Sequence, residues 1–132
     1  MQNAEWILKI MREDNLIVSM SYAFALKVVN VYKCIASGSG ERVMATQLLK
    51  SGTSIGANVH EAVRAQSKND FIAKMSIALK ESYETEYWLS LLKDSEYISV
   101  ADYDKLYKEN CDITNVISRI ILSAKSNDNK EK

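Results

Sequence analysis

The sequence predicts an all-α protein, folded as an up-down-up-down antiparallel four-helix bundle. The 132 residues include no proline and only four glycines, so residues that interrupt helices are scarce. Apolar residues recur every three or four positions along four stretches of roughly 25 residues each, as on the buried side of a helix. Short polar segments separate the stretches, and a chain of this length forms a single domain over residues 1–132.

The first helix is expected over residues 14–37. Its apolar stripe consists of Leu16, Met20, Ala23, Phe24, Val28, Val31, Tyr32 and Ile35. Residues 1–13 are either an N-terminal extension of this helix or a separate short helix. The Ser-Gly-Ser-Gly run at residues 37–40 is expected to form the first loop.

The second helix is expected over residues 42–65, with Gly52 and Gly56 in its interior. Each glycine costs about 1 kcal/mol there relative to alanine, so a packing advantage should offset it. The two glycines share one face of the helix. We expect the third or fourth helix to approach closely at this face.

The third and fourth helices each follow a serine suited to capping a helix N-terminus. Ser67 precedes a helix expected over residues 68–93, and Ser99 precedes one expected over residues 100–125. The third helix has the stripe Phe71, Met75, Ala78, Ser82, Thr85, Leu89 and Leu92. The stripe of the fourth includes Leu106, Asn110, Ile113, Ile117, Ile120 and Ala124. The polar residues 126–132 are expected to form a disordered tail.

The charges balance overall but are unevenly distributed along the chain. Lys and Arg number 17 and so do Asp and Glu, which argues against nonspecific nucleic-acid binding. Residues 41–80 carry six basic and three acidic side chains, whereas residues 81–109 carry three basic and eight acidic ones. Unlike regions on one molecule suit head-to-tail self-association. The alternative is an ordinary solvated surface.

The remaining composition indicates a cytoplasmic protein without a metal, cofactor or small-molecule substrate. Cys34 and Cys111 have neither metal-ligand nor disulfide spacing, which favours reduced thiols. The only histidine is His60, and Ala57 precedes it where a di-iron bundle has glutamate. No uninterrupted apolar run reaches the 18 residues of a membrane-spanning helix, and the acidic N-terminus does not resemble a signal peptide.

Polar side chains share the facing flanks of the second and third helices. The turn near residues 66–67 places Glu61 opposite Lys74, Ser54 opposite Lys80 and Glu81, and Lys50 opposite Glu84. We expect a polar seam that fixes the register of the two helices. The seam consists of Ser54, Asn58, Glu61, Glu81 and Glu84. A binding cluster, or acid–base catalysis by Glu81 and Glu84, is the alternative, although no nucleophile lies beside them.

Basic residues collect on the outer edge of the second helix and continue onto the third. Phosphate contacts require only clustered cations, so this edge is the candidate RNA-contact surface, with ordinary solvated surface as the alternative. The candidate residues are Arg42, Lys50, His60, Arg64, Lys68, Lys74 and Lys80. Several subunits acting together would strengthen the weak attraction of each one.

Aromatic residues exceed what the seam of one narrow bundle requires. Seven tyrosines and two tryptophans occur, several of them away from the predicted stripes. Such residues are typical of protein–protein interfaces. The candidate oligomer interface comprises Tyr22, Leu26, Tyr83, Tyr87 and Trp88. The alternative is that the tyrosines lie at the bundle surface with their hydroxyls in water.

Residues 48–92, from LLKSGTSIGANVHEAV to YWLSLL, resemble the bacterial four-helix-bundle proteins encoded within intervening sequences of 23S rRNA genes. Residues 21–33, SYAFALKVVNVYK, resemble their first helix. The matching positions include Ser54, Gly56, Asn58, Glu61, Phe71, Glu81, Glu84 and Trp88, and the resemblance attaches no catalytic role to them. It implies a homopentamer with a central channel. It extends to the accessory variability proteins of diversity-generating retroelements, which bind reverse transcriptase and RNA through basic surfaces.

Together these observations predict a non-enzymatic RNA-associated or scaffold protein that acts as a ring-shaped homo-oligomer, with a pentamer favoured. Structured RNA or a ribonucleoprotein is the expected partner. The alternative is a protein–protein adaptor whose acidic region docks a basic partner without contacting RNA. The neutral net charge departs from the strongly basic retroelement proteins.

Overall fold

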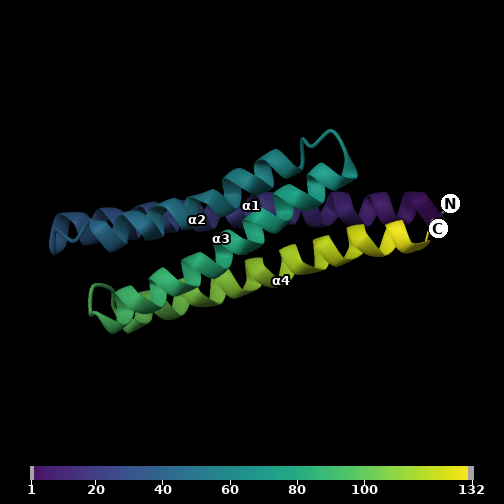
Figure 1. Ribbon diagram of the computed structural model, residues 1–132. Coiled ribbons are helices and arrows are strands. Elements are labelled where there is room, and N and C mark those ends of the chain that lie inside the picture. The colour runs from purple at the N-terminus through teal and green to yellow at the C-terminus, as the bar shows by residue number, and fades with distance from the viewer. Residues whose placement is uncertain (1, 131–132) are drawn as a thin grey trace.

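A computed structural model describes the backbone of residues 2–130 and the side chains of residues 15–126. The described residues form four helices: α1 (Gln2–Gly38), α2 (Val43–Ala62), α3 (Lys68–Asp94) and α4 (Val100–Lys130). They run alternately up and down (Figure 1), which confirms the predicted all-α, antiparallel four-helix architecture.

Two boundaries differ from the sequence expectation. Helix α1 runs without interruption from Gln2, so residues 2–13 extend the first helix and do not form a separate one. Helix α4 continues to Lys130, so the tail expected from residue 126 is helical as far as residue 130, and residues 131–132 lie outside the described part. A helix can extend beyond its apolar stripe because the backbone hydrogen bonds of each turn are internal to the helix.

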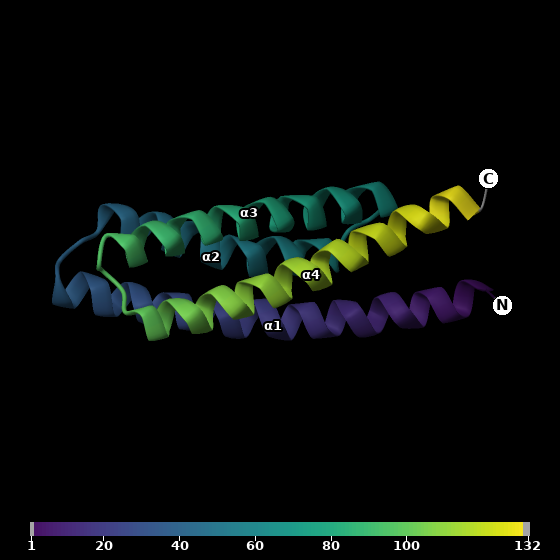
Figure 2. The same ribbon diagram turned by 90° about the horizontal axis from the view of Figure 1, so that it is seen from below.

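The four helices pack in a square. Helix α1 contacts α2 and α4, and α3 contacts the same two helices. Within residues 2–130, α1 and α3 therefore lie on one diagonal and α2 and α4 on the other. Helices α1 and α4 extend past the α2–α3 connection, so both chain ends lie at the same end of the bundle (Figures 1 and 2).

The core follows the predicted stripes most closely in α3. There Met75, Ala78, Ser82, Thr85, Leu89 and Leu92 are all buried. In α1 the stripe is shifted: Leu16 and Ala23 are exposed, whereas Ile17 and Ser21 are buried. The apolar residues of α1 occupy more than half of its circumference, so periodicity alone did not fix which side faces inward.

The glycines of α2 face α1, and the expectation that they face the third or fourth helix is wrong. A Cβ atom at Gly52 would lie 2.8 Å from both γ-methyl groups of Val28. A Cβ at Gly56 would lie 3.4 Å from the backbone oxygen of Ser21. The glycines allow another helix to pack closely, as predicted. Which helix packs there depends on how the four helices are arranged, and the apolar pattern of α2 does not determine it.

Helix termini are capped by nearby side chains. Ser67 and Ser99 accept hydrogen bonds of 3.1 Å from the backbone N–H groups of Asp70 and Asp102, which confirms both predicted N-caps. At the start of α2 the Glu41 carboxylate accepts from the N–H groups of Val43, Met44 and Ala45. The negative charge also complements the positive end of the helix dipole.

A buried polar cluster joins α3 to α4. Asn110 is 2% exposed, and its Nδ2 donates to the backbone oxygen of Ser82 at 2.9 Å. Thr114 Oγ1 lies 3.1 Å from Ser82 Oγ and donates to it. Asn110 Oδ1 has no hydrogen-bond partner among the described residues. The cluster favours one axial register of α3 and α4, since a shift would leave more polar atoms unpaired.

One segment of α1, Asn15–Gly38, is long and apolar enough to cross a membrane by length and composition alone. The count of uninterrupted apolar residues did not detect it, because single polar residues such as Ser21 and Lys27 divide the segment. In the bundle, Ile17, Phe24 and Val28 of this segment are buried against the other helices. Much of the remainder faces outward.

Candidate interaction surfaces

The predicted polar seam between α2 and α3 contains one ion pair. Lys74 Nζ lies 2.9 Å from Glu61 Oε2, as the expected register requires. The hydrogen bond to Glu61 and its negative charge raise the pKa of Lys74. The pair is solvent-exposed, so it aligns the helices more than it stabilises them.

The other seam residues form contacts within their own helices. Ser54 Oγ donates to Lys50 O at 2.5 Å, and Asn58 Nδ2 donates to Ser54 O at 2.8 Å. Glu84 is exposed and accepts from Trp88 Nε1 at 3.4 Å. Short polar side chains such as serine and asparagine readily donate to the backbone carbonyl one helical turn earlier. The expected row of cross-helix pairs is thus reduced to Glu61–Lys74 among the described residues.

The seam carboxylate Glu81 has an altered pKa. Partial burial raises its pKa above the ordinary value of 4.5, and the negative charge of Glu84 raises it further. The half-buried position explains the direction, because burial disfavours the charged form. Among residues 15–126, no hydrogen bond joins either carboxylate to a nucleophilic side chain.

The predicted basic residues lie along one edge of α2 and on α3. Arg42, Lys50, His60, Arg64 and Lys80 are exposed, whereas Lys68 and Lys74 are half-buried. Arg64 Nη1 lies 3.2 Å from His60 Nδ1 and 3.3 Å from the backbone oxygen of His60. Lys74 is engaged with Glu61. The edge of α2 is therefore the most accessible cationic surface of the predicted set.

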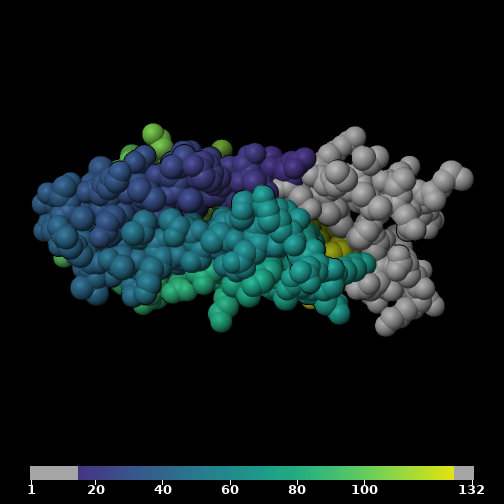
Figure 3. Space-filling view, turned by 90° about the horizontal axis from the view of Figure 1, so that it is seen from above, coloured from purple at the N-terminus to yellow at the C-terminus, as the bar shows by residue number. Residues whose placement is uncertain are grey.

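A groove lies between α1 and α2, beside this basic edge. It has a volume of about 430 Å³, and we call it the α1–α2 groove. Its lining is mainly apolar or small, because the glycine at position 56 lets the two helices approach closely. Figure 3 shows α1 and α2 side by side over this face of the molecule. The lining residues are Val18, Ser21, Tyr22, Ala25, Thr53, Gly56, Ala57, His60 and Glu61.

Large apolar side chains are exposed on all four helices, and the exposed aromatic ones within helices lie on α1 and α3, which are diagonally related. On α1, Tyr22 is 67% exposed and Leu26 is 50% exposed. On α3, Tyr83 is 54% exposed and Tyr87 is 60% exposed. Tyr87 contacts the half-buried Trp88 edge-on, with ring centroids 5.0 Å apart. We call Tyr83 and Tyr87 the α3 tyrosine ridge.

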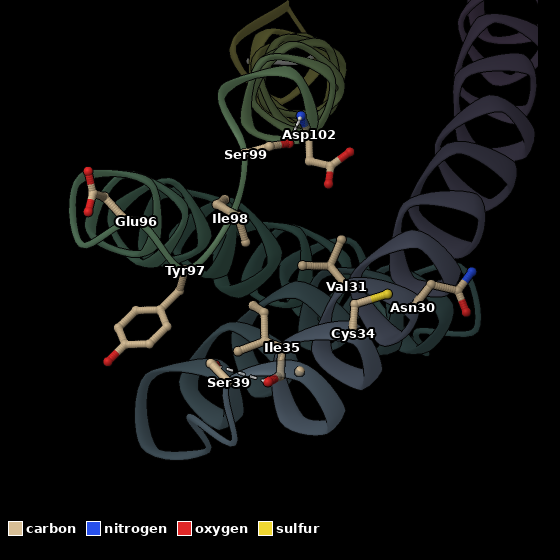
Figure 4. Close-up of a pocket in the computed structure, with 11 residues that line it drawn as sticks. Asn30, Val31, Cys34, Ile35, Ser39, Glu96, Tyr97, Ile98, Ser99 and Asp102 are labelled. Carbon is tan, nitrogen blue, oxygen red and sulfur yellow. Dashed lines mark hydrogen bonds between the residues drawn. The ribbon is translucent and has the colours of Figure 1, made fainter.

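A second cavity, of about 440 Å³, lies where the end of α1 meets the α3–α4 connection. Figure 4 shows Val31, Cys34 and Ile35 of α1 on one side and Tyr97, Ile98 and Asp102 on the other. Its two serines form hydrogen bonds with nearby backbone groups: Ser39 donates to Ile35 O, and Ser99 accepts from the N–H of Asp102. Cys34 contributes an exposed free thiol to this cavity.

Among residues 15–126, no group of three or more His, Cys, Asp or Glu side chains is placed to hold a metal ion. The two cysteines are free thiols, Cys34 exposed and Cys111 half-buried. Tyr107 has a raised pKa, chiefly because it is hydrogen-bonded to Cys111.

The fold and these surfaces define an all-helical bundle with apolar and charged faces available for association. A model of the 23S rRNA-intervening sequence protein family matches residues 13–119. The chain belongs to this family, as the sequence resemblance predicted. No curated protein matches the chain.

A solved structure supports the assignment. The crystal structure at 1.70 Å of a protein of unknown function, from the S23 ribosomal protein family of Bacteroides thetaiotaomicron, is 47% identical in sequence. The alignment covers 83% of this chain and 97% of that chain, with a TM-score of 0.81.

Sequence reasoning missed some of the residues that shape these surfaces. Glu41 was not recognised as the cap of α2, because the carboxylate reaches the helix from outside the usual capping position. The α1–α2 groove was not foreseen either. The small residues at positions 53, 56 and 57 signal it only once α1 is known to be the neighbour of the glycines.

Proposed function

We propose that the protein is a non-enzymatic, RNA-associated scaffold that works as a ring-shaped homo-oligomer in the cytoplasm. The observation that supports it best is the presence of exposed aromatic side chains on two diagonally related helices, next to an exposed basic edge. Aromatic side chains are enriched at interfaces between proteins, so these exposed residues support self-association.

The arrangement favours a ring over a two-fold dimer. In a two-fold dimer the same patch on each subunit meets itself, whereas in a ring two different patches meet. Tyr22 and Leu26 lie on α1, diagonally across the bundle from Tyr83 and Tyr87 on α3. Two separate patches on opposite sides are what a ring requires, and the family resemblance favours five subunits.

The basic edge of α2 supports contact with RNA. Arg42, Lys50 and Arg64 along this edge, with Lys80 on α3, are exposed cations that can reach phosphate groups. A single subunit has no net charge, so its own attraction for RNA is weak. A ring repeats the same edge, and simultaneous contacts raise the overall affinity.

The test is fluorescence anisotropy with a structured RNA and with duplex DNA, at low and at physiological salt. We expect RNA binding that weakens steeply as salt rises, because phosphate contacts release counterions. Arg42→Glu combined with Lys50→Glu should reduce the affinity at least tenfold without changing the mass in light scattering. Lys105→Glu, an exposed lysine on α4, is the matched control and should leave binding unchanged.

The acidic region supports one alternative, an adaptor for a basic protein. Residues 81–109 carry eight acidic and three basic side chains. An assembled protein that binds neither nucleic acid at low salt would favour the adaptor and exclude the RNA-associated role. The absence of a membrane partner is part of the proposal, and attachment of the purified protein to lipid vesicles would contradict it.

A further inference from the structure

We infer that the α3 tyrosine ridge of one copy docks into the α1–α2 groove of the next copy. The inference rests on the proposed homo-oligomer and specifies the two surfaces that meet in it. The occupant of the groove is therefore a second copy of this chain.

The groove has the chemistry of a socket for an aromatic side chain. Val18, Ala25, Gly56 and Ala57 give it an apolar lining, and Tyr22 stands at its edge. A buried tyrosine removes about 150–250 Å² from water, and offset aromatic contacts add to that gain. A volume of about 430 Å³ leaves room for more than a single small group.

The ridge has the chemistry of the matching plug. Tyr83 and Tyr87 lie one turn apart on α3, and both are more than half exposed. Tyrosine is favoured in such positions because its ring is apolar while its hydroxyl can stay hydrogen-bonded. The contact with Trp88 limits the freedom of the Tyr87 ring, which lowers the entropy lost on docking.

The charges around the two surfaces are complementary. The exposed cation Arg64 lies beside the groove, next to the groove residue His60. Glu84 is exposed between the two ridge tyrosines in the sequence, and Lys80 is an exposed cation one turn before Tyr83. The region that follows, residues 81–109, carries eight acidic and three basic side chains. The one acid in the groove, Glu61, is paired with Lys74. A ridge therefore meets a groove more favourably than either surface meets itself.

Two variants each disable one surface. Ala57→Arg places a long cation at an exposed position in the groove and leaves the ridge intact. The double variant Tyr83→Ser with Tyr87→Ser removes the ridge and leaves the groove intact. The changed side chains are exposed, so both variants should fold, which circular dichroism verifies.

Light scattering of the separate and mixed variants tests the docking. Each variant alone should have the mass of one chain, 14.9 kDa. An equimolar mixture should form a heterodimer of twice that mass and no larger species. The intact ridge of Ala57→Arg can dock into the intact groove of the tyrosine variant, and no further pair of intact surfaces remains. Ala101→Arg and Tyr97→Ser, exposed and outside both surfaces, are the matched controls and should keep the wild-type mass.

Other outcomes separate this inference from the proposed function. A monomeric wild-type protein would exclude the ring and the docking together. An assembled wild type whose two variants also stay assembled would overturn the docking alone. Monomeric variants that do not pair on mixing would show that the two surfaces do not meet each other. Retained mass with lost RNA binding in Ala57→Arg would assign the groove to RNA instead.

Discussion

Gly52 of α2 and Val28 of α1 pack so closely that no side chain larger than a hydrogen atom fits at position 52. A Cβ there would lie 2.8 Å from both γ-methyl groups of Val28 and 3.2 Å from its Cβ. Valine in a helix is held in one rotamer, so its methyl groups cannot swing away. This contact sets the distance between the two helices that form the groove.

Gly52→Ala should therefore destabilise the protein, although alanine is the better helix former. Overpacking costs typically 1–3 kcal/mol and the gain in helix propensity is about 1 kcal/mol, so we expect a net loss of up to about 2 kcal/mol. Denaturant unfolding measures it. In a Val28→Ala background the same substitution should become neutral or stabilising. An unchanged cost in that background would show that Val28 is not the obstacle.

Gly56→Ala is expected to act in the opposite direction. The nearest neighbour of a Cβ there is the backbone oxygen of Ser21 at 3.4 Å, which is close to ordinary contact. The gain in helix propensity should dominate and raise the free energy of unfolding by up to about 1 kcal/mol. Thermal unfolding of the two alanine variants side by side tests this contrast. A loss at position 56 as large as that at position 52 would contradict it.

Asn110→Ala should lower the free energy of unfolding by about 1–3 kcal/mol. The substitution removes the bond from Nδ2 to Ser82 O and leaves a cavity between α3 and α4. Asn110→Leu is the informative companion, because it restores the volume that alanine loses, while both substitutions remove the unpartnered Oδ1. We expect the leucine variant to be the more stable of the two in urea unfolding. Equal stability would mean that side-chain volume does not matter at this position.

Glu96→Gly should stabilise the end of α3. Glu96 follows the helix with φ of 67°, a left-handed conformation that costs a residue with a Cβ about 1–2 kcal/mol. Glycine adopts it freely but loses more entropy on folding, so a net gain of about 0.5–1 kcal/mol is expected. The melting temperature reports the gain, and Glu96→Ala, which keeps the Cβ, should show none.

The raised pKa of Glu81 predicts a specific pH dependence of stability. Folding favours the protonated carboxyl, so the free energy of unfolding falls as the pH rises from the ordinary glutamate value of 4.5 through the raised one. Glu81→Gln should remove this decline, making the variant more stable than wild type at neutral pH and less distinct below pH 4.5. Melting temperatures across this range provide the measurement. Glu84→Gln should show a smaller effect in the same direction.

The fold was predictable because local signals agreed with one another. In α3 the stripe is narrow, Ser67 caps the start, and every buried residue follows the expected spacing. In α1 the signals conflicted, since Leu16 and Ile17 are equally apolar and only the position of α2 and α4 decides between them. The partner of Gly52 depended on the same topology, so the sequence pattern left it open.

The sequence predicted which residues lie on the candidate surfaces better than it predicted the hydrogen bonds that these residues form. Exposure of Arg42, Lys50 and Arg64 follows from their place opposite the apolar stripe. The expected bonds of Ser54 and Asn58 to the third helix did not follow, because short polar side chains reach their own backbone first. The expected proximity of Glu61 and Lys74 is found in the structure, because both side chains are long and lie on either side of the α2–α3 turn.

The two chain ends leave the bundle at the same end, as Figures 1 and 2 show. Rotation about a ring axis keeps every copy of a point at the same height along that axis. In a ring whose bundles stand parallel to the ring axis, anything fused to either terminus would therefore gather on a single rim, in as many copies as there are subunits. The opposite rim, formed by the α1–α2 and α3–α4 connections, would stay open. The assembly would have two chemically distinct ends, and a label on a terminus would distinguish them in electron microscopy.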